Sequence, residues 1–246
     1  MNYTITFTQG YSIMNMSISP WMVSLRLLFL SLPLLLNDFY LPLVPEDAVT
    51  LDLVLDVIIY IGWQTSIIYM AWQAGWFTFS DIGFKREGIG REVLLGLGLL
   101  VIVFVTFILV LLVGMFIDLQ FGLELSSRWY FPVPENWHPA KAFLYVFYLS
   151  ITAGVFEEII YRGIVIRQLD SVTRSDLLKV VLSTLLFVLI HWSMGPQTWI
   201  EAGLFGALWA YIFIRTDSLV PNIVAHFLYD LITIYGLHDG IINSLV

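Results

Sequence analysis

The chain has 246 residues, of which 59% are hydrophobic and only 12% are charged. A soluble domain carries about 25% charged residues, so this composition excludes an ordinary soluble protein and predicts an integral membrane protein. We expect a single membrane domain over residues 1–246, surrounded by the lipid bilayer. The net charge of −8 argues against nucleic acid as a partner, and the lack of cysteine excludes disulfides and thiolate nucleophiles.

Apolar runs separated by polar or turn-forming residues predict the membrane-spanning helices. In chain order these runs cover residues 21–44, 51–76, 92–117, 141–169, 177–194, 199–214 and 219–237. Only helices satisfy the backbone of a long apolar run in lipid, and about 20 residues cross the hydrocarbon core. The predicted fold class is therefore all-α, a polytopic transmembrane helical bundle of about seven spans. Breaks at Pro33 and Gly236 leave about six to eight spans compatible with the sequence.

The loops give an expected orientation. Residues 1–20 lack the basic region that begins a signal peptide, so we expect no cleaved leader there. Basic residues gather in the loops after the second, fourth and sixth runs, at Lys85, Arg86, Arg91, Arg167, Arg174, Lys179 and Arg215. Because short basic loops stay in the cytoplasm, we expect a multi-pass protein of the cell membrane with a cytoplasmic N-terminus.

Several ionisable residues lie inside the predicted spans, where a charge is costly unless it is paired or serves a function. They are Glu157, Glu158 and Arg162 in the fourth run, His191 in the fifth, and His226 and Asp230 in the last. With a rise of about 1.5 Å per residue, the first glutamate, both histidines and the aspartate lie about 14 to 20 Å from the inner ends of their helices. We therefore expect these four residues to share one buried polar pocket near the bilayer midplane.

Helical spacing separates the two adjacent glutamates. Glu158 and Arg162 are four residues apart and share a helix face, which predicts an ion pair. Glu157 is rotated by about 100° from Glu158 and is free to point into the pocket. The same spacing of four places His226 and Asp230 on one face of the last helix.

This set of residues favours hydrolysis by an activated water. A glutamate set against two histidines can act as a general base, and imidazoles can orient a water or stabilise an oxyanion. Phe187 stands four residues before His191 and is expected to line the same side of its helix.

The chain contains EExxxR at residues 157–162, FxxxH at residues 187–191 and HxxxD at residues 226–230. In this order and on three different predicted helices, the motifs resemble those of the CAAX protease and bacteriocin-processing (CPBP, or Abi) family of intramembrane glutamic endopeptidases. The type II CAAX prenyl endopeptidases belong to this family. The resemblance covers about residues 144–235, and we predict a catalytic core over residues 141–237.

The resemblance implies an intramembrane endopeptidase. By it, Glu157 activates the attacking water, while His191, His226 and Asp230 hold that water and the scissile carbonyl. The residues expected to support the site are Glu158, Arg162 and Phe187. The implied substrate is a membrane-associated or lipidated peptide or protein.

Asp230 departs from the family pattern, in which asparagine is commonest at this position. The extra carboxylate also makes Glu157, His191, His226 and Asp230 reasonable zinc ligands. We expect no cofactor, with zinc as the alternative.

Two other functions stay open at this stage. Buried Glu and His chains also relay protons, which is compatible with a proton-coupled membrane transporter. A catalytically idle immunity or interaction protein that keeps the fold is the other alternative. Three further acidic residues of the spans are expected to be solvated near helix ends, namely Asp52, Asp56 and Glu201.

Overall fold

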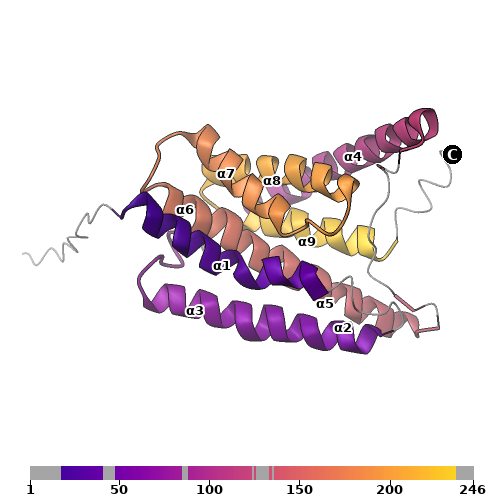
Figure 1. The fold of residues 1–246 in the computed structure, drawn as a ribbon, viewed down its shortest axis with the longest axis horizontal. Helices are drawn as coiled ribbons and strands as arrows, with labels where there is room; N and C mark the ends of the chain where they lie inside the picture. Colours follow the sequence, from indigo (N-terminus) through magenta and orange to yellow (C-terminus); the bar gives the residue numbers. More distant parts are fainter. Residues whose placement is uncertain are drawn as a thin grey trace, which may run out of the picture.

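The computed structural model describes residues 18–40, 48–84, 88–123, 125, 133–134 and 136–236. Over these residues the chain forms seven continuous helical runs and no strands (Figure 1). The runs are α1 (Pro20–Tyr40); α2, η2 and α3 (Val49–Asp56, Val57–Gln64 and Thr65–Gln73); α4 (Ile89–Phe121); α5, η3 and α6 (Pro139–Glu157, Glu158–Val165 and Ile166–Leu169); α7 (Asp176–Leu189); α8 (Pro196–Thr216); and α9 (Val220–Ile234). The segments η2 and η3 are π-helical turns inside longer α-helices.

The prediction of an all-α helical bundle is confirmed. Pro33 lies inside α1 without ending it, and α9 ends just before Gly236, whose φ of +73° suits a helix C-terminus. Three helical runs are long and apolar enough to cross a membrane, namely Val49–Gln73, Ile89–Phe121 and Pro139–Leu169. Residues 1–17, and Lys85 and Arg86 of the orientation argument, lie outside the described residues.

The run α5–η3–α6 passes through the middle of the bundle. In Figure 1, α1 and α2–η2–α3 lie on one side of it, and α7, α8 and α9 lie on the other. All eight residues of η3 are buried, including its charged ones. The charged side chains of η3 are therefore enclosed by protein and do not face lipid.

Small residues let α9 approach its neighbours closely. A Cβ atom added to Gly154 of α5 would lie 2.9 Å from the backbone nitrogen of Phe227 on α9. A Cβ added to Gly96 of α4 would lie 2.8 Å from the carbonyl oxygen of Pro221, at the start of α9. Close backbone approach at small residues is typical of membrane helix pairs. It wedges α9 between α4 and α5 and brings its polar residues against η3.

The expectation that Asp52 and Asp56 are solvated is wrong. Asp52 is 4% exposed and Asp56 is 9% exposed, because this face of α2 packs against α5. The hydroxyl of Tyr145 on α5 donates a hydrogen bond to Asp52 Oδ2 at 2.8 Å. A partner from a distant helix thus makes burial of the carboxylate tolerable.

Candidate active site

The junction between α5 and η3 carries the charged residues. Glu157 is the last residue of α5, and Glu158 begins the π-helical turn that contains Arg162. Glu157 is 4% exposed, and both Glu158 and Arg162 are fully buried. π-helical turns inside α-helices occur frequently at functional sites. This junction is therefore the centre of the candidate site.

Glu158 holds two partners at one carboxylate oxygen. Its Oε1 lies 2.9 Å from Arg162 Nη1, the ion pair that the spacing of four residues predicts. The same oxygen lies 2.9 Å from Nδ1 of His226 on α9. Because an ionised carboxylate only accepts hydrogen bonds, Nδ1 is the donor in this second contact.

His226 lies between the two adjacent glutamates. With Nδ1 held by Glu158, its Nε2 lies 3.9 Å from Glu157 Oε2 and 3.5 Å from Asp230 Oδ2. Three of the four residues predicted to share a pocket are thus gathered around one imidazole ring. Two of them, Glu157 and Asp230, approach the same nitrogen from different helices.

His191 lies in the turn after α7, and not in a helix as the predicted span of residues 177–194 required. The physical reason is local: the His191 side chain contacts the Phe187 carbonyl oxygen through Nδ1 at 2.8 Å, while its backbone N–H bonds to Val188 instead. The indole of Trp199 donates to the His191 carbonyl oxygen at 3.0 Å and fastens the turn. The helix therefore tightens and ends at Leu189.

Phe187 connects the two histidines. Its ring centroid lies 4.9 Å from that of His191 and 6.0 Å from that of His226. The Arg162 guanidinium carbon lies 4.1 Å from the centre of the same ring. Phe187 thus packs at the centre of the predicted residues through its apolar ring alone.

Trp209 of α8 contacts the predicted site residues, although the sequence analysis did not predict it as part of the site. Its ring stacks on His226 with centroids 4.3 Å apart and an interplanar angle of 26°. It also lies 5.2 Å from the guanidinium carbon of Arg162. No motif marks Trp209, because a tryptophan in an apolar run is usually a core or interfacial residue.

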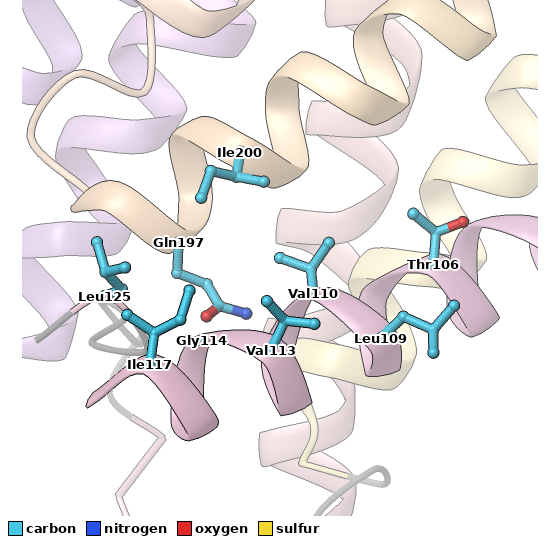
Figure 2. Close-up of a pocket in the computed structure, with 9 residues that line it drawn as sticks. All are labelled: Thr106, Leu109, Val110, Val113, Gly114, Ile117, Leu125, Gln197 and Ile200. Carbon is cyan, nitrogen blue, oxygen red and sulfur yellow. The ribbon is translucent and has the colours of Figure 1, made fainter. Parts of the chain in front are cut away.

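The expectation that Glu201 is solvated is also wrong. Glu201 is 3% exposed and accepts hydrogen bonds from Gln197 Nε2 at 2.7 Å and from the Tyr229 hydroxyl at 3.0 Å. Gln197 also lines an apolar groove between α4 and the start of α8 (Figure 2). None of the predicted site residues lines this groove.

The geometry of the site bears on the alternative that Glu157, His191, His226 and Asp230 bind zinc. Among the residues that the structure describes, no three His, Asp or Glu side chains come together in an arrangement that could hold a metal ion. Glu157, His226 and Asp230 converge, whereas His191 joins them through the Phe187 ring. The zinc alternative therefore has no formed ligand set here, and the absence of a cofactor stays a prediction.

Comparison with known proteins agrees with the motifs. Residues 139–232 match a family model described as Type II CAAX prenyl endopeptidase Rce1-like. No curated protein and no solved structure matches the chain. The matched region begins at the start of α5 and ends within α9, so it contains every predicted site residue. Together with the long apolar helices, this match indicates a membrane protein in which residues 139–232 are similar to the Rce1-like type II CAAX prenyl endopeptidases, as the resemblance in sequence predicts.

Proposed function

We propose that this protein is an intramembrane endopeptidase that hydrolyses a peptide bond of a membrane-associated or lipidated protein. The observation that carries the proposal is the position of His226, whose Nδ1 is bound by Glu158 while its Nε2 faces Glu157 and Asp230. The Rce1-like family of residues 139–232 supports proteolysis as the reaction. The buried, largely apolar surroundings strengthen every electrostatic contact inside the site.

In the proposed mechanism Glu157 is the general base. It takes a proton from a water molecule as the water oxygen attacks the carbonyl carbon of the scissile peptide bond. The negative charge that develops on the carbonyl oxygen is stabilised by hydrogen bonds from His226 and His191. Glu157 then gives its proton to the departing nitrogen as the C–N bond breaks, which leaves a carboxylic acid and an amine.

The other polar residues prepare this step. Glu158 keeps His226 oriented through Nδ1 and is itself neutralised by Arg162. Asp230 lies 3.5 Å from His226 Nε2 and helps to orient the water and the imidazole. No step requires a metal, because a buried glutamate and two imidazoles supply both the base and the oxyanion partners.

The proposal includes a placement in the membrane. The seven helices form a multi-pass protein of the cell membrane with a cytoplasmic N-terminus and a site near the bilayer midplane. Support comes from the exposed apolar side chains of α4, such as Val101 at 62% and Leu109 at 57%, which suit contact with lipid. Because the chain has no cysteine, single cysteines at Arg174 and Pro134 report their side of the membrane without background labelling.

The activity is tested with purified protein in lipid nanodiscs and a set of prenylated, acylated and unmodified peptides. Cleavage by wild type and its loss in Glu157→Gln support the proposal. Asp176→Asn is the matched control, since Asp176 lies in the exposed first turn of α7 and pairs with Lys179 outside the site. Equal cleavage by wild type and Glu157→Gln, or none by wild type with any lipidated peptide, would contradict it.

A further inference from the structure

Trp209 contacts the proposed site from a helix that bears none of the three motifs. It is 1% exposed, and its indole N–H makes no hydrogen bond to the described residues. What Trp209 offers the site is therefore the face of its ring. That face stacks on the His226 imidazole, with ring centroids 4.3 Å apart and 26° between the ring planes.

The backbone of Trp209 is hydrogen-bonded to α9, the helix that carries His226. Asn222 of α9 is fully buried and donates from Nδ2 to the Trp209 carbonyl oxygen at 2.8 Å. Asn222 and His226 are four residues apart, so they share one face of α9. Trp209 thus meets α9 at two successive turns, once through its carbonyl and once through its ring.

Stacking on Trp209 restricts a rotation of the His226 ring that its hydrogen bond to Glu158 does not restrict. The outer side-chain torsion of histidine is broad, and one hydrogen bond at Nδ1 still allows the imidazole to tilt about that contact. A tilt moves Nε2 away from Glu157, which lies 3.9 Å away, and from Asp230. A flat aromatic surface against the ring removes the tilt.

Trp209 also lies beside the arginine of the site. The guanidinium carbon of Arg162 is 5.2 Å from the Trp209 ring centre. An aromatic face attracts cations, so the same indole that stacks on His226 also stabilises the permanently charged guanidinium. This contribution depends on the π system, and an aliphatic side chain of similar size cannot replace it.

We propose that Trp209 is a positioning residue of the reaction, which holds the His226 ring so that Nε2 faces Glu157 while Nδ1 stays on Glu158. This inference rests on the proposed function, because Trp209 acts through His226 and touches no reacting atom. Its signature is a loss of turnover without a comparable loss of substrate binding.

The first test compares three variants in the peptide cleavage assay. Trp209→Met is expected to lower kcat at least tenfold while KM changes by less than about threefold, since only orientation in the reacting state is lost. Trp209→Phe keeps a smaller stacking ring and is expected to retain kcat within about threefold of wild type. The control is Phe205→Met, one turn away on α8, where an aromatic ring 3% exposed packs against Trp209 at 5.9 Å. It is expected to lose similar thermal stability with kcat near wild type.

The second test needs no substrate. The chain has four histidines, so ¹⁵N-histidine labelling gives few signals, and His226→Gln assigns the one of interest. Wild type is expected to show one protonation pattern at the two His226 nitrogens, and Trp209→Met an exchanging mixture. Should Trp209→Met fail to fold, the Trp209→Phe spectrum and its kcat decide.

The two tests separate this inference from the proposed function. Ordered His226 signals in wild type that are lost in Trp209→Met uphold the positioning role even if no peptide is cleaved. Unchanged His226 signals and unchanged kcat in a folded Trp209→Met overturn it while proteolysis by wild type stands. A Phe205→Met variant that loses as much kcat as Trp209→Met overturns it as well, because the loss would then follow from helix packing alone.

Discussion

Nδ1 of His226 lies 2.9 Å from Oε1 of Glu158, the same oxygen that pairs with Arg162. The second glutamate of the pair is therefore a structural partner of both the arginine and the imidazole. Its neighbour Glu157 stays 3.9 Å from the opposite nitrogen of the same ring. One histidine thus contacts two adjacent carboxylates through opposite ring nitrogens, which supports the different roles proposed for them.

Replacing Glu157 with glutamine is expected to abolish peptide cleavage and leave folding almost intact. An amide has nearly the same shape but cannot accept the proton of the attacking water. The measurements are turnover of a cleavable peptide and the melting temperature in detergent. A Glu157→Gln protein that unfolds readily, or one that still cleaves, would show that the role is wrongly assigned.

Replacing Glu158 with glutamine is expected to destabilise the protein by about 3–5 kcal/mol, because a buried guanidinium loses its ion-pair partner. Activity is expected to fall too, since His226 loses the acceptor of its Nδ1 proton. Chemical unfolding in detergent measures the first effect and peptide turnover the second.

The control for this variant is Asp170→Asn, directly after α6. Asp170 is 39% exposed and pairs with Lys179 and Arg167 outside the site. Lys179 is mostly buried but keeps Asp176 as a second partner, so this variant is expected to cost about 0–1 kcal/mol. Equal destabilisation by the two variants would contradict the role of Glu158 as the partner of a buried guanidinium.

Asp230→Asn is expected to keep kcat/KM within about tenfold of wild type, a barrier change of at most about 1.4 kcal/mol. An amide oxygen can still accept from His226 Nε2, and asparagine is the commoner residue in the motif. Strong chelators are expected to leave turnover unchanged. Stoichiometric zinc that chelation removes together with activity, and whose return restores activity, would instead support the zinc alternative.

Gly154→Ala is expected to destabilise the protein by about 1–3 kcal/mol, since an added methyl group must displace a closely packed neighbour. That neighbour is the backbone nitrogen of Phe227, 2.9 Å from the new Cβ, directly after His226. Cleavage should fall as well, because moving α9 takes His226 away from Glu157. The matched control is Gly98→Ala on α4, where no atom lies within 4 Å of the added Cβ. It is expected to be neutral or stabilising, as alanine favours helix over glycine.

Local periodicity predicted the helices and the ion pair within one of them. The seven apolar runs each became a helical run, and the spacing of Glu158 and Arg162 gave their contact. Both outcomes depend on residues close in sequence, where helix geometry alone decides which side chains meet.

Contacts between residues that are far apart in the sequence could not be predicted from local periodicity. Asp52 bonds to a tyrosine 93 residues away, and His226 to Glu158 across 68 residues. A sequence pattern records the polarity of a residue and not the partner that another helix supplies. For this reason Asp52 and Glu201 were expected to be solvated, and the aromatic face of Trp209 was overlooked.

The short length of α9 has a consequence for the surrounding lipid. With 15 residues it extends about 22 Å, while the hydrocarbon core is about 30 Å thick. Such hydrophobic mismatch is relieved when the bilayer thins beside a short helix. His226 and Asp230 both lie on α9, so in the proposed placement local thinning shortens the path of water to Glu157. Turnover should therefore decrease in vesicles of longer acyl chains, in which thinning costs more.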